Sequence, residues 1–166
     1  GSMLLAHEAS LDAKRLTEIL LRKADMDLGQ APVVPSCVYT TPELAQVGLT
    51  EEACKAGGIS CFTAKATTTA NARNLILGGE RGFINLVCNP ERQVLLGAQL
   101  MGPRATDMVD TLALAINEEI SLDRLDAQCH AHPSFSESLG MAVRAAIEKT
   151  KVQTTGVQTF LCFKSD

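Results

Sequence analysis

Residues 83–101 of this 166-residue chain read FINLVCNPERQVLLGAQLM, and this stretch decides the fold. In its first part Ile84, Leu86 and Cys88 recur at every second position, the spacing that places side chains on one face of a β-strand. Residues 89–93, NPERQ, then interrupt the pattern as a turn, and a second apolar run follows them. The sequence therefore predicts an antiparallel β-hairpin with one buried face.

The elements on either side of the hairpin differ in kind. Before it, short strands are predicted at residues 37–40, 44–48 and 59–67, with a short helix at 51–56 capped by Thr50. After it, helices are predicted at residues 103–116, 122–127 and 136–149. Residues 68–79 fit neither pattern clearly. Because a run of strands precedes a run of helices, the expected fold class is α+β, an antiparallel sheet with helices packed on one face.

The N-terminal part is predicted to stand apart from this sheet. Residues 5–24 carry an apolar stripe at helical spacing, and the glycine and prolines of residues 27–35 then oppose regular structure, so we expect a helix and a linker. Residues 1–3 resemble the remnant of a cleaved tag, which suggests that the chain was cut from a longer protein. The expected division is a remnant at 1–3, a helix and linker at 4–34, a sheet domain at 35–150 and a tail at 151–166.

Composition excludes several classes of protein. Hydrophobic residues make up 46% and charged residues 20% of the chain, as in an ordinary globular core. No apolar run approaches the roughly 20 residues that cross a bilayer, so we expect no membrane segment. A net charge of −4 without a basic stripe argues against nucleic-acid binding. Six cysteines without a C-x-x-C pair indicate reduced thiols, and with no secretory signal we expect a cytoplasmic protein.

The chemistry-bearing residues gather at 129–137, CHAHPSFSE. Cys129, His130 and His132 are possible metal ligands, but a structural zinc site uses four ligands, usually from two separated pairs. This spacing fits no common pattern, and we expect no metal.

Two other interpretations of residues 129–137 stay open. In the first, Pro133 holds His132 in an extended segment, and Glu137 accepts a hydrogen bond from one ring nitrogen and so raises the basicity of the other. The pair would then transfer protons near neutral pH. In the second, Ser134 and Glu137 form the S-x-x-E capping box of a helix, in which Glu137 reaches back to the Ser134 amide. The residues alone favour the cap, because capping boxes are common.

At this stretch the sequence resembles the C-terminal signature of the flavin-dependent disulfide reductases. Residues 129–137 are most similar to the pattern C-H-A-H-P-T-x-x-E of the dihydrolipoyl dehydrogenases, with Ser134 in place of the threonine. Residues 35–51, 82–101 and 105–115 agree with the same family in order and spacing, and LLAH at 4–7 resembles the end of its flavin-binding region. The resemblance covers roughly residues 4–148 and leaves the tail unexplained.

The resemblance implies a specific role for residues 35–150, that of the dimerisation, or interface, domain of an enzyme that uses FAD and NAD. His132 would be the base that takes a proton from a dihydrolipoyl thiol in the active site of the other subunit, with Glu137 as its orienting partner. Leu5, Ala6, His7 and Pro133 would lie near the flavin. The implied partners are a second copy of the chain, in a homodimer, and the lipoyl domains of 2-oxo acid dehydrogenase or glycine cleavage complexes.

The chain departs from the family by what it lacks. No G-x-G-x-x-G follows a predicted strand, and no paired redox cysteines appear, since Cys54 and Cys61 look like ordinary thiols. We therefore expect this chain to bind neither cofactor and to be inactive alone. The alternatives are a stand-alone, non-catalytic dimerisation module, or the same domain of a glutathione or mercuric reductase. The coding sequence upstream of residue 4 would separate a fragment from a stand-alone module.

Overall fold

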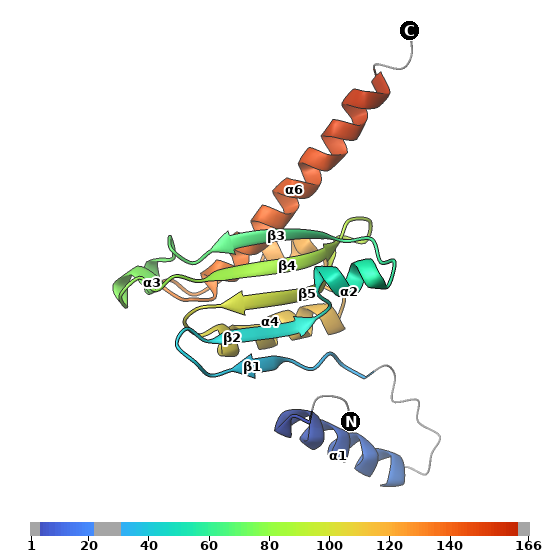
Figure 1. Ribbon diagram of the computed structural model, residues 1–166, viewed down its shortest axis with the longest axis vertical. Coiled ribbons are helices and arrows are strands. Elements are labelled where there is room, and N and C mark those ends of the chain that lie inside the picture. The colour runs from blue at the N-terminus through green and yellow to red at the C-terminus, as the bar shows by residue number, and fades with distance from the viewer. Residues whose placement is uncertain (1–3, 22–30, 163–166) are drawn as a thin grey trace.

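The computed structural model describes residues 4–21 and 31–162, and the backbone alone for 152–162 (Figure 1). Five strands and six helices make up this part of the chain. In chain order they are α1 (Ala6–Leu21), β1 (Ser36–Val38), β2 (Leu44–Gly48), α2 (Glu51–Ala56), β3 (Phe62–Thr67), α3 (Ala72–Ile76), β4 (Phe83–Asn89), β5 (Val94–Met101), α4 (Ala105–Asn117), α5 (Leu122–Asp126) and α6 (Glu137–Cys162). The α+β class that the sequence predicts is confirmed.

The five strands form one antiparallel sheet in the order β1-β2-β5-β4-β3. The predicted hairpin, β4 and β5, supplies two of the three inner strands, and the register of the pair shifts between Val87 and Cys88. Asn89 organises the turn between these strands, because its side-chain oxygen accepts hydrogen bonds from the backbone amides of Glu91 and Arg92, at 3.0 and 2.8 Å. The strongest local signal in the sequence thus marks the centre of the sheet.

Helices cover one face of this sheet, as the sequence predicts. α4 packs on β2 and β5, while α6 packs on β3 and β4, and both helices lie behind the sheet in Figure 1. Between the layers lies a core of fully buried side chains that includes Ile84, Leu86, Ala98, Val109 and Ala142. The opposite face is more polar, since Asn85 donates to Gln99 at 2.8 Å and Lys65 lies 3.9 Å above the Phe83 ring.

Helix α4 begins two residues later than predicted. Arg104 precedes it with a φ of +60°, so Pro103 lies outside the helix rather than in its first turn. Arg104 contributes no side-chain cap. The carboxylate of Glu43 takes that place from the start of β2, because one of its oxygens accepts from the Thr106 amide at 3.0 Å and from the Thr106 hydroxyl at 2.7 Å. The N-terminus of α4 is therefore capped by a residue that lies far from it in the sequence.

Other element boundaries also differ from the predictions. α6 continues through Cys162, so the predicted helix end at residue 149 is wrong, and in Figure 1 its last turns run beyond the sheet. The strand predicted at 59–67 begins only at Phe62, and the ambiguous residues 68–79 contain the short helix α3. α1 is confirmed over Ala6–Leu21, whereas residues 1–3 and most of the predicted linker lie outside the described residues. No described helix is long and apolar enough to cross a membrane.

Candidate active site

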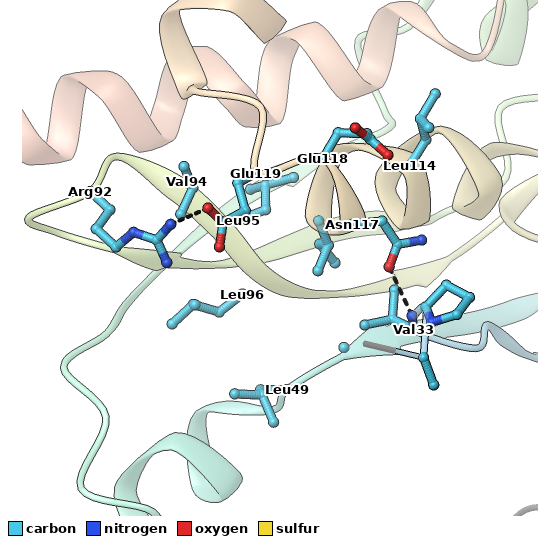
Figure 2. A pocket seen from close by; sticks show the side chains of 14 residues that line it. Val33, Leu49, Arg92, Val94, Leu95, Leu96, Leu114, Asn117, Glu118 and Glu119 are labelled. Carbon is cyan, nitrogen blue, oxygen red and sulfur yellow. Dashed lines mark hydrogen bonds and ion pairs between the residues drawn. The ribbon is translucent and has the colours of Figure 1, made fainter. Parts of the chain in front are cut away.

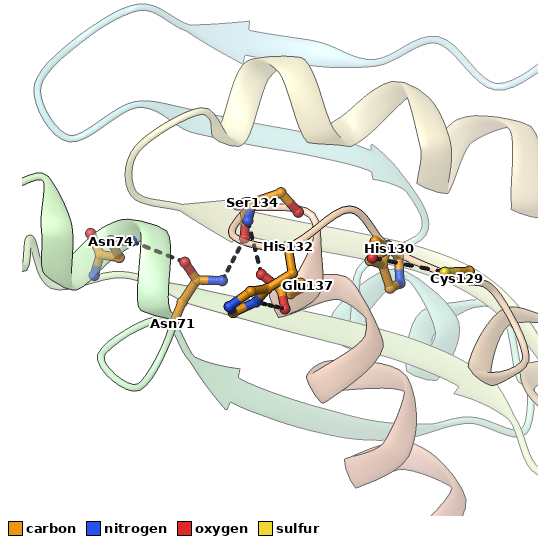
Figure 3. Close-up of polar contacts among 7 residues, drawn as sticks. All are labelled: Asn71, Asn74, Cys129, His130, His132, Ser134 and Glu137. Atoms are coloured by element: carbon orange, nitrogen blue, oxygen red, sulfur yellow. Dashed lines mark hydrogen bonds and ion pairs between the residues drawn. The ribbon is translucent and has the colours of Figure 1, made fainter.

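Residues 128–136 form a loop between α5 and α6, and this loop carries the motif residues (Figure 3). α5 is short: Ser121 is its N-cap, and five helical residues follow. After it the chain runs past the N-terminal end of α3 before α6 starts at Glu137, and the His132–Pro133 peptide bond within the loop is cis. The connection between α5 and α6 thus meets the connection between β3 and β4.

His132 is hydrogen-bonded to Glu137 and otherwise faces outward. The distance between His132 Nδ1 and Glu137 Oε1 is 2.9 Å, while 70% of the His132 side chain is exposed against 29% for Glu137. An ionised carboxylate only accepts hydrogen bonds, so Nδ1 carries the proton and the neutral ring presents the lone pair of Nε2 to its surroundings. That is the tautomer that can accept a proton at Nε2.

The second oxygen of Glu137 holds the backbone of the loop. Oε2 of Glu137 accepts a hydrogen bond from the Ser134 amide at 2.8 Å. The two interpretations of this motif are therefore compatible, because one carboxylate orients the ring with one oxygen and caps the helix with the other. The capping box is one-sided, however, since the Ser134 hydroxyl is buried and has no hydrogen-bond partner in the described part of the chain.

The same contacts keep Glu137 ionised. The Ser134 amide and then the His132 ring hydrogen-bond to the carboxylate, and together they lower the pKa of Glu137 below its ordinary value. Its position in the first turn of α6 also favours a negative charge, because the backbone amides at a helix N-terminus carry partial positive charge. The acceptor for the His132 Nδ1 proton is thus maintained at neutral pH.

A cavity of about 390 Å³ opens beside His132 and Glu137. Gln128, Met141 and Arg144 also line it, although they lie outside the motif at residues 129–137 that indicates the site. Met141 and Arg144 stand four and seven residues after Glu137, so they share a face of α6 with it, and helical spacing counted from Glu137 could have found them. The remaining lining residues are Ala70, Asn71, Ala72 and His130.

The three residues weighed as metal ligands are not brought together. His130 packs against α6, where a Cβ on Gly140 would lie 3.2 Å from the His130 ring. Figure 3 shows Cys129 and His130 apart from His132. Among residues 4–21 and 31–162, no group of three or more His, Cys, Asp or Glu side chains is arranged to hold a metal ion.

The other residues predicted near a flavin are divided between two places. Pro133 lies beside His132 in the loop, whereas Leu5, Ala6 and His7 lie at the start of α1. His7 Nε2 lies 2.8 Å from the carbonyl oxygen of Pro35, next to β1, which is the edge strand opposite β3. Within one chain, residues 5–7 and Pro133 therefore do not form one site.

Cys54 and Cys61 are free thiols, as are Cys37, Cys88 and Cys129. Burial, followed by a hydrogen bond with Cys61, raises the pKa of Cys54, and burial raises the pKa of Cys88 to about 12. Both groups therefore stay protonated at neutral pH. Cysteines in catalytic dithiols instead have lowered pKa values.

A larger cavity of about 590 Å³ lies between β5, the end of α4 and residues 31–33 (Figure 2). The Val33 amide donates to the Asn117 side-chain oxygen across it at 2.8 Å, and Arg92 pairs with Glu119 at its rim. None of the residues predicted to act in catalysis or cofactor binding lines this cavity. The candidate active site is therefore the smaller cavity beside His132.

The one-sided cap predicts which variant loses stability. Replacing Ser134 with alanine removes a buried hydroxyl that makes no hydrogen bond, so the free energy of unfolding should stay the same or rise by about 1 kcal/mol. The control is Thr50→Ala, because the Thr50 hydroxyl does accept a hydrogen bond, from the Ala53 amide at 3.1 Å. That variant should lose about 1 kcal/mol. Urea unfolding of both variants makes the comparison, and an equal loss in both would contradict a one-sided cap.

The pKa of Glu137 can be used to separate the contributions of its two hydrogen-bond donors, the Ser134 amide and the His132 ring. Because the pKa of Glu137 is lowered in the folded chain, its contacts stabilise the fold fully at a pH above the ordinary pKa of glutamate. This contribution is lost as the pH falls through the lowered pKa of the folded state. In a His132→Gln variant, the pKa of Glu137 should rise only part of the way, because the Ser134 amide is the larger cause and remains. Carboxyl ¹³C NMR measures both values. A pKa for Glu137 at or above about 4.3 in the unsubstituted chain would contradict the expectation.

Comparison with known proteins supports the resemblance inferred from the motif. Residues 34–143 match the family described as pyridine nucleotide-disulphide oxidoreductase, dimerisation domain. A dihydrolipoyl dehydrogenase of Chlorobaculum parvum is 36% identical over 148 residues, which are 89% of this chain and 31% of that protein. The mitochondrial dihydrolipoyl dehydrogenase 1 of Arabidopsis thaliana is 35% identical over 88% of this chain and 28% of that protein. The chain thus spans less than a third of the length of these relatives.

Solved structures agree on the fold. LpdA from Mycobacterium tuberculosis superposes with a TM-score of 0.77 at 26% identity, over 87% of this chain and 31% of that one. RclA from Escherichia coli, an HOCl-induced flavoprotein disulfide reductase, superposes with a TM-score of 0.76 at 26% identity, over 86% of this chain and 33% of that one. Because the family match extends over most of the chain, this chain belongs to the dimerisation domain family of the pyridine nucleotide-disulphide oxidoreductases.

Proposed function

We propose that this chain is the interface domain of a dihydrolipoyl dehydrogenase, an enzyme that oxidises protein-bound dihydrolipoamide with FAD and NAD, and that His132 is its proton acceptor. The observation that carries the proposal is the hydrogen bond from His132 Nδ1 to Glu137, which leaves Nε2 facing outward. The C-H-A-H-P motif and the 36% identity to a dihydrolipoyl dehydrogenase support this substrate class over that of other disulfide reductases.

Proton transfer follows from the geometry of this pair. A dihydrolipoyl thiol placed at Nε2 would lose its proton to the ring, which becomes an imidazolium, while the thiolate remains on the substrate. The Glu137 carboxylate, 2.9 Å from Nδ1, stabilises the positive charge that develops and keeps the ring orientation fixed. The exposure of His132 suits a base that serves a cleft outside its own chain, as it would across a dimer interface.

The residues of this chain do not fit a dinucleotide cofactor. A pyrophosphate binds where a strand turns into a helix and free backbone amides point at it. Of the described turns of this kind, β2–α2 carries Glu51 and Glu52 in the first helical turn, which would repel a phosphate. At β3–α3 the side chain of Asn71 occupies an amide, and at β5–α4 that of Glu43 does. We therefore assign FAD and NAD to parts of the parent enzyme outside this chain, and propose that the chain alone is inactive.

The alternative is a stand-alone dimerisation module, and the match of this chain to less than a third of its relatives leaves that alternative to be tested. An upstream coding region with a G-x-G-x-x-G turn and a redox dithiol would support the enzyme. A natural start codon near Met3 without such a region would support the module.

Substitution of the base tests the proposed function. In the full-length enzyme, His132→Gln should reduce the turnover of dihydrolipoamide by about a hundred- to ten-thousand-fold, the usual effect of losing a general base. The control is Lys55→Gln, which removes an exposed ion pair with Glu51 on α2 and should leave turnover unchanged. Steady-state assays with dihydrolipoamide and NAD measure both variants. Turnover of His132→Gln within twofold of the parent would remove the assignment.

Dimerisation is the second part of the proposal. Leu75, Ile76 and Leu77 are each about 60% exposed and follow closely on Asn71, which contacts the His132 loop. Such an apolar patch beside an outward-facing base supports an isologous interface with a second copy.

Light scattering during size-exclusion chromatography should therefore give the mass of two chains. Ile76→Lys should shift the population toward monomer, because it places a charge in the interface. Ile59→Lys should leave the mass unchanged, because Ile59 is also an exposed isoleucine but lies beside α2, away from this patch. A monomeric mass for the unsubstituted chain at every concentration would count against the proposal.

A further inference from the structure

The backbone of Ser134, two residues after His132, is held through both its N–H and its carbonyl group (Figure 3). Its N–H donates to Glu137 Oε2 at 2.8 Å, and its carbonyl oxygen accepts from Nδ2 of Asn71 at 2.9 Å. Glu137 belongs to α6, whereas Asn71 belongs to the connection between β3 and β4. Within the described contacts, the bond from Asn71 is the one hydrogen bond that ties residues 132–134 to the connection between β3 and β4.

Asn71 is itself held in a defined orientation. Only 2% of it is exposed, its backbone amide donates to the Thr68 carbonyl at 3.1 Å, and its side-chain oxygen accepts from the Asn74 amide at 3.0 Å as the N-cap of α3. A backbone amide can only donate, so the side-chain oxygen of Asn71 faces Asn74 and the NH₂ group faces Ser134. Both ends of this amide therefore have one partner each, and the choice of asparagine follows from needing an acceptor and a donor together.

The support continues one residue further into the fold. Asn74 is 1% exposed, and its side-chain NH₂ donates to the carbonyls of Thr68 and Glu80 at 3.0 and 2.8 Å. These bonds fix the two ends of the connection that carries Asn71, between β3 and β4. Because buried amides of this kind are costly to leave unpaired, the connection is held in one arrangement. Asn71 thus offers the loop an anchor that does not move with α6.

We infer that Asn71 is a positioning residue for His132. It holds the Ser134 carbonyl against the connection between β3 and β4, so that the ring of His132 and the carboxylate of Glu137 keep the separation at which Nδ1 donates and Nε2 stays free. The inference rests on the proposed function of His132 as a proton acceptor. The printed contact of Asn71 in this loop is with the Ser134 carbonyl, so Asn71 acts on His132 through the backbone of the loop.

Two substitutions remove the anchor and keep the helix cap. Asn71→Ser retains a side-chain oxygen for the Asn74 amide, since serine is a good N-cap, but it has no donor that reaches Ser134. Asn71→Asp also caps α3 and puts an acceptor in place of the donor, opposite the Ser134 carbonyl. The matched control is Thr50→Ala, which removes the cap of α2, at the opposite end of the sheet from α3 in Figure 1.

The readout is the ring tautomer of His132, measured by ¹⁵N NMR on the 166-residue chain. The unsubstituted chain should show a single tautomer with the proton on Nδ1. In Asn71→Ser and Asn71→Asp, the tautomer protonated on Nε2 should appear beside it. The Ser134 amide should exchange with solvent about fivefold faster or more, because a loop that has lost its anchor at the Ser134 carbonyl opens more often. Thr50→Ala should lower the thermal midpoint and leave the His132 tautomer unchanged. Should one Asn71 variant fail to fold, the other carries the test.

The outcomes also separate this inference from the proposed function. An unchanged His132 tautomer and Ser134 exchange rate in both Asn71 variants would overturn the positioning role, even if His132→Gln abolishes turnover. In the full-length enzyme, Asn71→Ser should lower kcat by about tenfold with little change in KM, because displacement of a catalytic group slows the chemical step. A change in the tautomer together with an unaffected His132→Gln enzyme would support the anchor and reject the base. Equal shifts of the tautomer in Thr50→Ala would mean a general loss of stability and would overturn the inference.

Discussion

The carboxylate of Glu137 is the contact on which the site depends. One oxygen accepts from the His132 ring and the other from the Ser134 amide, so one side chain both starts α6 and sets the tautomer of the neighbouring imidazole. Its charge is favoured by the same contacts and by the helix N-terminus, and it therefore needs no further partner. One carboxylate can cap the helix and orient the ring, because capping uses only one of its two oxygens and leaves the other to accept from the imidazole.

The site forms where two connections of the fold meet. Packing of α6 against β3 and β4 brings its N-terminal turn close to the end of β3, and the short helix α3 leaves Asn71 facing the loop that precedes α6. The core between the sheet and the helices is apolar, and its packing holds the two connections next to each other. The reactive side chains lie at the rim of a rigid layer, which is where loops commonly carry function.

The sequence predicted local features well and distant ones poorly. The alternation of Ile84, Leu86 and Cys88 identified the central hairpin, because a strand and its turn are encoded by neighbouring residues. The hydrogen bond between His132 and Glu137 is one of two interpretations that residues 129–137 leave open, and the structure contains both it and the contact of Glu137 with the Ser134 amide. The start of α4 was misplaced because its cap comes from Glu43, 63 residues before Thr106 in the chain.

Asn71 escaped notice for the same reason as Glu43. It also lies 63 residues from its partner Ser134, and a lone asparagine in a polar segment has no periodicity that marks it. The end of α6 was missed differently, because the apolar stripe that indicated the helix fades before the helix itself stops. Periodicity reports what a helix buries, and a helix that leaves the core loses that signal.

The two hydrogen bonds that the Glu137 carboxylate accepts have a consequence for how the chain can change in length. Between His132 and Glu137 the backbone spans two fixed contacts, and an inserted or deleted residue would break at least one of them. The turn at residues 89–93 is restricted as well, because the Asn89 side chain accepts from two of its amides and the Gln93 carbonyl accepts from the Leu122 amide at 2.8 Å. The length of the step from the imidazole to its carboxylate is therefore set by the two hydrogen bonds that Glu137 accepts.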